Sequence, residues 1–232
     1  MDFGFSLSQM GSTANPDEIV SLAKHGEKLG FHAVTLGDHI VVSNKINSPY
    51  PYEATGKFPS SGEFLDQLTT LSFLAAKTNK IRIMTGVMVL PLRHPIIAAK
   101  MLATIDVLSK GRLTVGVGVG WLKEEFDALG LPTFEQRGSI SNEYIQIIKE
   151  VWTNNEPYFN GKHFRFSGLT FLPKPIQSPH PPIWIGGESP SALRRAAEFG
   201  DGWYPIGNNT NFPLGKIDDL KSSLERLSIY AE

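Results

Sequence analysis

The chain has 232 residues, of which 41% are hydrophobic and 19% charged, as is ordinary for a soluble globular protein. Its formal net charge of −1 gives no electrostatic basis for binding nucleic acid or an anionic membrane, and the absence of cysteine excludes disulfides, thiolate metal sites and cysteine nucleophiles. The N-terminus has no basic region before an apolar stretch, and no apolar run approaches the ~20 residues of a membrane span, so we expect a cytoplasmic protein.

Segments with strand and helix patterns alternate along the chain. Asn15, followed by Pro16 and two acids, is typical of a helix start, and Gly30 is typical of a position just past a helix end. Apolar periodicity predicts strands over 3–7, 33–37, 81–89, 112–121, 182–186 and 202–206. It predicts helices over 15–29, 64–77, 95–108, 123–129, 139–152, 190–199 and 216–230.

Two long segments interrupt this alternation. Residues 40–62 combine proline and tyrosine with Asn, Ser and Gly, and we expect a loop there; loops of this length inside a compact domain are usually functional. Residues 155–181 are rich in aromatic residues, glycine and proline, and we expect a hairpin excursion. No linker divides the chain, so we predict a single domain over 1–232 with these two segments as insertions.

The run from Arg112 to Trp121 is the most informative strand. Val115, Val117 and Val119 alternate in it with three glycines, which removes every side chain from one face. The spacing G-x-G-x-G is not a dinucleotide-binding fingerprint. Two explanations stay open: a flat cofactor approaches the backbone at this strand end, or a tight barrel interior requires small residues.

Strand–helix alternation predicts a parallel sheet, either doubly wound or closed as a barrel. The first strand–helix turn, over 8–14, lacks the glycine pattern of a phosphate-binding loop. Unusual residues follow or end four different strands, and a barrel collects its active site in this way. They are Asp38-His39, Gly86-Val87, Gly120-Trp121 and Gly187-Glu188-Ser189. We therefore predict an α/β fold of the TIM-barrel type.

These segments resemble a known family when they are taken in order. The motifs are Leu36-Gly-Asp-His39, Thr85-Gly-Val87, Gly116-Val-Gly-Val-Gly-Trp121, Arg137-Gly138 before a helix ending in Val151-Trp152, and Ile185-Gly-Gly-Glu-Ser-Pro190 through Gly200-Asp-Gly-Trp203. Together they resemble the bacterial luciferase-like monooxygenase superfamily, and most closely its branch of coenzyme F420-dependent oxidoreductases. The resemblance covers 3–230 and implies a barrel that binds a flavin or deazaflavin at the carboxyl ends of its strands.

The resemblance also implies roles for single residues. Asp38 would contact the deazaflavin, and His39 would donate or accept the substrate's proton; the plain alternative is a capping aspartate and a structural histidine. Gly86-Val87 would form a bulge with a cis peptide bond under the cofactor ring. Val119 and Gly120 would lie against that ring. Gly187, Glu188 and Ser189 would hold the cofactor phosphate at a helix start, where free amide groups bind anions, unless Ser189 only caps the helix.

Other polar residues receive plainer interpretations. Trp121 stands where some sugar-phosphate-oxidising F420 relatives carry a glutamate that protonates the deazaflavin, so we expect it to wall a substrate pocket or to pack in the core. Glu124 and Glu125 are expected on a solvated helix face, and Arg93 in a helix-start turn. The histidines show no metal-ligand spacing, and we assign no metal.

Six strands are fewer than the eight of a complete barrel. Three explanations stay open: a fragment of a longer gene product, a natural form shortened at its C-terminus, or two further units hidden in 40–62 and 155–181. An open barrel exposes strand edges, so we predict a homodimer. The leading function is an F420-dependent oxidoreductase that transfers a hydride between cofactor and a small organic substrate. The alternatives are an FMN-dependent monooxygenase and a shortened flavin-binding relative without turnover.

Overall fold

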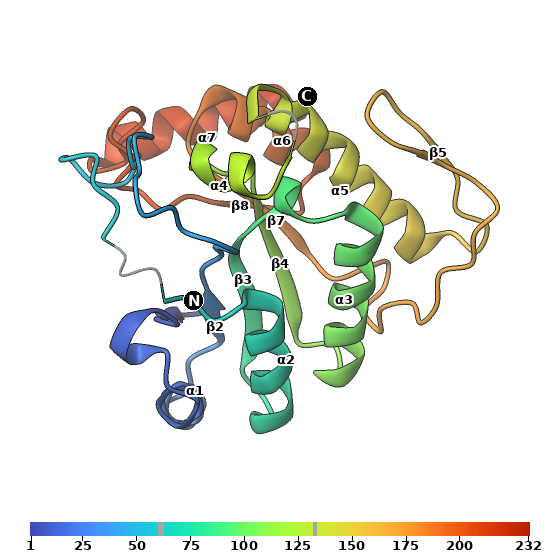
Figure 1. Cartoon of the computed structure of the whole chain (residues 1–232), viewed down its shortest axis with the longest axis horizontal. Coiled ribbons are helices and arrows are strands. Elements are labelled where there is room, and N and C mark those ends of the chain that lie inside the picture. The colour runs from blue at the N-terminus through green and yellow to red at the C-terminus, as the bar shows by residue number, and fades with distance from the viewer. Residues whose placement is uncertain (60–62, 132–133) are drawn as a thin grey trace.

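The computed structural model describes residues 1–59, 63–131 and 134–232, and its centre is one curled parallel sheet (Figure 1). Six strands form this sheet in the order β1-β2-β3-β4-β7-β8, and each pairs in parallel with its neighbour. The strands are β1 Gly4–Leu7, β2 Ala33–Leu36, β3 Arg82–Val89, β4 Leu113–Gly118, β7 Ile183–Gly186 and β8 Gly202–Tyr204. The predicted parallel α/β sheet is confirmed.

The helices lie around the outside of the sheet, and apolar side chains from both layers form the main core. The α-helices are α1 Pro16–Leu29, α2 Gln67–Lys77, α3 Pro95–Leu108, α4 Lys123–Ala128, α5 Arg137–Thr153, α6 Pro190–Phe199 and α7 Ile217–Ala231, and short 3-10 turns cover Gly11–Thr13, Leu90–Leu92 and Phe134–Gln136. In the described residues, none of the helices is both long and apolar enough for a membrane crossing.

The helix ends follow local chemistry. Asn15 Oδ1 accepts hydrogen bonds from the amides of Asp17 at 2.9 Å and Glu18 at 3.2 Å, and Gly30 ends the helix with a positive φ of 85°. The predicted start of α2 was three residues early. Asp66 caps that helix by accepting from the Thr69 amide at 2.8 Å, while Phe64 pairs with Met10 in a β-bridge.

The two interrupting segments contribute no strand to the main sheet in their described residues. The excursion over 155–181 carries the predicted hairpin, an antiparallel pair of β5 (Phe159–Asn160) and β6 (Arg165–Phe166) that projects away from the sheet. The segment over 40–59 is a loop, and residues 60–62 of the prediction lie outside the described residues. Two hidden strand–helix units are therefore not found in the described parts of these segments.

The glycines of β4 face a bulge in β3. The pairing register shifts between Thr85 and Met88, and the peptide bond between Gly86 and Val87 is cis, so both predicted features are confirmed. A Cβ atom added to Gly116 would lie 2.2 Å from the carbonyl oxygen of Thr85, and one added to Gly118 would lie 2.7 Å from Cγ2 of Val87. The tight-interior explanation accounts for both glycines, because protein atoms already fill the space beside them.

This packing makes the two glycines costly to replace. Gly116→Ala should lower the free energy of unfolding by about 1–3 kcal/mol, because the obstructing Thr85 atom belongs to the backbone and cannot rotate away. Gly118→Ala should cost less in a Val87→Ala background than alone, because Val87 is its obstruction. Urea denaturation measures both effects. Gly37→Ala is the control, since nothing lies within 4 Å of the added Cβ; equal losses at 37 and 116 would contradict the packing argument.

Candidate active site

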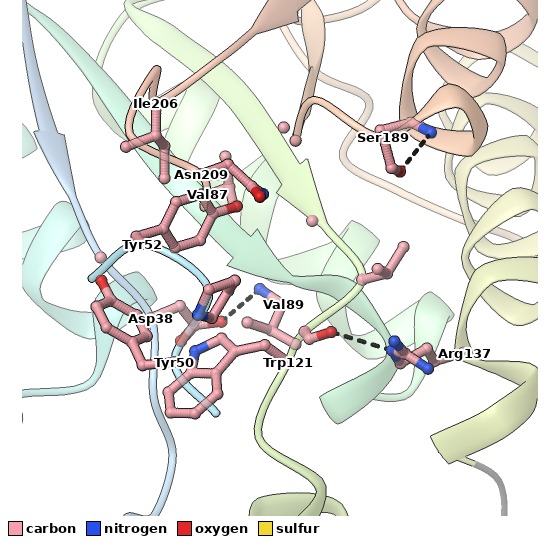
Figure 2. A pocket seen from close by; sticks show the side chains of 18 of the residues that line it. Asp38, Tyr50, Tyr52, Val87, Val89, Trp121, Arg137, Ser189, Ile206 and Asn209 are labelled. Carbon is pink, nitrogen blue, oxygen red and sulfur yellow. Dashed lines mark hydrogen bonds between the residues drawn. The ribbon is translucent and has the colours of Figure 1, made fainter. Parts of the chain in front are cut away.

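A cavity of about 1120 Å³ opens at the carboxyl ends of the strands. Nine of the ten predicted site residues line it: Asp38, His39, Val87, Val119, Gly120, Trp121, Gly187, Glu188 and Ser189. The tenth, Gly86, packs behind Val87, where an added Cβ would lie 2.8 Å from Cβ of Thr35. Figure 2 shows Asp38, Tyr50 and Trp121 on one side of the cavity and Arg137 and Ser189 on the other. The fold thus brings the predicted residues together around one space.

The ring of His39 is held by the carboxylate of Glu125, a residue that the sequence predicted on a solvent-exposed helix face. Its Nδ1 lies 2.9 Å from Oε2 of Glu125, and the two side chains are 9% and 2% exposed. The other oxygen of Glu125 accepts hydrogen bonds from the amides of Ile40 at 2.6 Å and Val41 at 3.2 Å. A carboxylate only accepts, so Nδ1 donates and Nε2 is the ring nitrogen left for a ligand.

The expectation of a solvated helix face was therefore wrong for Glu125, which is buried, whereas Glu124 is partly exposed and binds the loop. Oε1 of Glu124 accepts hydrogen bonds from the amides of Asn47 at 2.7 Å and Ser48 at 3.0 Å. Burial works to raise the pKa of Glu124, but the hydrogen bonds from Ser48 and Asn47 outweigh it and lower the pKa to about 2. The first turn of α4 thus anchors the long loop over 40–59 at two separate points.

Asp38 is fully engaged by protein groups. Arg93 donates to its two oxygens at 2.6 and 2.8 Å, and the amide of Val89 donates to Oδ2 at 2.8 Å. Its side chain has no exposed surface, and burial raises the pKa of the carboxyl while Arg93 opposes that rise. Arg93 is therefore more than part of a helix-start turn, because it neutralises a buried charge beside His39.

Glu188 and Ser189 also have protein partners. Glu188 is buried, and its oxygens accept from the Ile206 amide at 2.6 Å and from Nδ2 of Asn209 at 3.0 Å. Ser189 Oγ accepts from the Ala192 amide at 3.2 Å, which confirms the predicted cap of α6. Gly187, just before them, has a φ of 102°, a conformation that favours glycine. Glu188 thus shapes the loop after β8, while Ser189 opens α6 at the cavity edge.

Two arginines complete the side of the cavity near α6. Arg137 donates from Nε to the carbonyl of Gly120 at 3.0 Å, and Arg195 donates from Nε to Oδ1 of Asn142 at 2.6 Å. Burial lowers the pKa of both guanidinium groups. In the described part of the chain, neither forms an ion pair with a carboxylate. Their side chains therefore bring positive charge to a partly buried surface without an acidic partner.

Sequence reasoning quoted Arg137 only as part of a motif and missed Arg195. Helical spacing could have indicated Arg195, because it lies three residues after Ala192 and directly before Ala196, on the face of α6 that is buried. No group of three or more His, Asp or Glu within residues 1–59, 63–131 and 134–232 is arranged to hold a metal.

A comparison with protein families now adds to this geometry. The model of a family described as luciferase-like monooxygenase matches residues 1–225. The chain belongs to the luciferase-like monooxygenase family. This confirms the predicted family, which was inferred from five short motifs.

A comparison with a single curated protein shows how much of a relative this chain covers. It is 36% identical over 159 residues to the FMNH2-dependent dimethylsulfone monooxygenase of Pseudomonas putida, an alignment that covers 68% of this chain and 44% of that protein. The chain thus spans less than half the length of this relative.

Solved structures of the luciferase-like type share the fold. A monooxygenase from Streptomyces bottropensis matches with a TM-score of 0.78 and 26% identity, covering all of this chain and 66% of that one. A coenzyme F420-dependent tetrahydromethanopterin reductase from Methanopyrus kandleri matches with a TM-score of 0.77 and 22% identity, covering 99% and 60%. The six-stranded sheet is therefore a half-barrel of the luciferase-like TIM-barrel type, as predicted.

Proposed function

We propose that this chain is an oxidoreductase that binds FMN across the carboxyl ends of β3, β4 and β7 and acts on a small organic substrate beside His39. The observation that carries this proposal is the division of one cavity into two chemically different sides. Arg137, Arg195 and the start of α6 form one side, and the paired His39 and Glu125 stand at the other.

The arginine side fits the phosphate of a nucleotide cofactor. A helix start favours negative charge, and guanidinium groups bind phosphate through several parallel hydrogen bonds. Gly187 and Ser189 line the same part of the cavity. Ser189 Oγ already accepts from the Ala192 amide, so the charge for this site comes from Arg137 and Arg195.

The floor between the two sides fits the cofactor ring. Val87, carried inward by the bulge of β3, lines the cavity together with Gly118, Val119 and Gly120. Small or branched apolar residues without a projecting polar group present a surface on which a flat ring can lie. Reduced FMN, when bound, supplies the electrons of the reaction.

The chain's own part in the chemistry is to position a proton. Glu125 holds Nδ1 of His39, so Nε2 can donate or accept a proton at a substrate atom in the cavity. Asp38, whose oxygens are taken by Arg93 and Val89, fixes the backbone beside His39. We therefore assign proton transfer to His39 and a positioning role to Asp38.

Two points support the choice of FMN over coenzyme F420, the cofactor favoured by the sequence motifs. The relative that is 36% identical is named for FMNH2, whereas the F420-dependent reductase matches at 22% identity. In addition, the chain has Trp121 where sugar-phosphate-oxidising F420 relatives are expected to carry a proton-donating glutamate. Coenzyme F420 remains the second candidate because the Asp38-His39 motif resembles that of its enzymes.

A titration with FMN, riboflavin and coenzyme F420 tests this proposal. FMN should bind about 10- to 100-fold more tightly than riboflavin, because only FMN carries the phosphate that the arginines receive. Arg195→Met should lower this preference several-fold, because Arg137 remains, and should leave riboflavin affinity unchanged. Arg194→Met is the matched control, because that neighbouring guanidinium lies 4.9 Å from the ring centroid of Tyr230. Equal affinities for FMN and riboflavin in the unchanged chain would refute the phosphate site, and tighter binding of F420 would reverse the order of cofactors.

The homodimer and the cytoplasmic location stay predictions. The dimer is supported by the position of β1 and β8 at the two edges of the sheet and by apolar side chains of α7 that remain exposed, among them Ile217, Leu224 and Ile229.

A further inference from the structure

The side of the cavity that contains His39 is built from aromatic rings. We call Tyr50, Phe58, Phe64 and Trp121 the aromatic box. The ring centroids of Tyr50 and Trp121 are 5.0 Å apart, and those of Phe58 and Trp121 are 5.2 Å apart. His39 lies 4.9 Å from Phe58 and 5.2 Å from Phe64, so its ring is part of the same cluster.

The box also presents surface to a ligand. All four rings line the cavity and are only partly buried. The loop over 40–59 supplies Tyr50 and Phe58, while Trp121 follows β4. Figure 2 shows Tyr50 and Trp121 together, on the side away from Arg137 and Ser189. A ligand in the box is therefore separated from the two arginines.

Three ionisable side chains at or beside His39 and Trp121 have partners in the described part of the chain. Asp38 is bound by Arg93, His39 by Glu125, and Lys123 donates to both oxygens of Asp127 at 2.8 and 2.9 Å. An anion that left water for the box would lose its hydration without gaining a free counter-ion, and the negative faces of the rings would not attract it. The carboxylate of Glu188 is likewise enclosed by its amide donors and 3% exposed.

We propose that the aromatic box selects a substrate without negative charge, with a flat or alkyl body, and places its reacting polar atom at Nε2 of His39. The identity of this occupant as the substrate rests on the proposed function, whereas the preference against an anion follows from the box itself. Arg137 and Arg195 do not serve as counter-ions in the box, because they lie across the cavity from it.

Two probes of nearly equal size and shape test the charge preference. Benzamide is neutral and benzoate is an anion, and each can be titrated by calorimetry into the chain with and without saturating FMN. Benzamide should bind at least about ten-fold more tightly than benzoate, because only the anion loses hydration without compensation. Equal or tighter binding of benzoate would overturn the proposal.

Variants locate the probe. Trp121→Leu should weaken benzamide about ten-fold, since one aromatic contact is lost, and Phe58→Leu provides the same test if the first variant fails to fold. Tyr158→Leu is the control, because that ring is 60% exposed on the hairpin excursion. Unchanged benzamide affinity in both box variants would overturn the assignment. If benzamide is selected but neither FMN nor F420 binds, the proposed function fails and the charge selectivity of the box stands.

Discussion

Replacing Glu125 by glutamine should reverse the ring tautomer of His39 and lower turnover about 100-fold. In the unchanged chain, the carboxylate accepts from Nδ1 at 2.9 Å, so the neutral ring carries its proton there. Glutamine keeps one acceptor oxygen but turns the other into a donor. If its oxygen stays with the amides of Ile40 and Val41, its amino group faces Nδ1 and drives the ring proton to Nε2.

Nitrogen NMR of the histidine ring measures this tautomer directly and needs no substrate. Glu124→Gln is the matched control, because Glu124 anchors the same loop through Asn47 and Ser48, whereas the His39 hydrogen bond is made by Glu125. The control should leave the tautomer of His39 unchanged. If both variants changed turnover equally while the tautomer stayed the same, Glu125 would only be a loop anchor and its positioning role would be disproved.

Arg93→Met should have the largest effect on stability, about 3–5 kcal/mol of the free energy of unfolding. The substitution leaves the carboxylate of Asp38 buried, without exposed surface and without its positive partner. The double variant Asp38→Asn/Arg93→Met should recover much of this loss, because a neutral amide is far less costly to bury than an unpaired charge. Urea denaturation of the two single variants and the double variant gives the coupling energy.

Arg82→Met provides the comparison for this prediction. Arg82 is the first residue of β3, and its partners are neutral: the hydroxyl of Thr114 at 3.1 and 3.0 Å, the carbonyl of Leu113 at 2.7 Å and Oε1 of Gln177 at 3.1 Å. Its replacement should cost only about 1 kcal/mol, since the hydrogen-bond partners left behind are not charged. A loss at Arg93 no greater than the loss at Arg82 would show that Asp38 does not depend on its ion pair.

Sequence patterns predicted the features that depend on neighbouring residues. The Asn15 cap, Gly30 and the alternating glycines of β4 act within a few positions, so helix ends and strands were placed closely. The partners of the site were hidden because they lie far along the chain. Glu125 is 86 residues from His39 in the sequence. Two adjacent acids in a helix predict a solvent-exposed face, and only the tertiary fold places Glu125 beneath the loop that contains Ile40 and Val41.

The anchoring of the long loop has a consequence for how this protein could acquire new specificity. Glu124 and Glu125 hold the loop through backbone amides, which every residue except proline provides. The side chains at 50 and 58 can therefore be exchanged while the loop keeps its course. The scaffold separates the part that must be retained, on α4, from the part that selection can alter, and directed evolution of substrate range should begin at those loop positions.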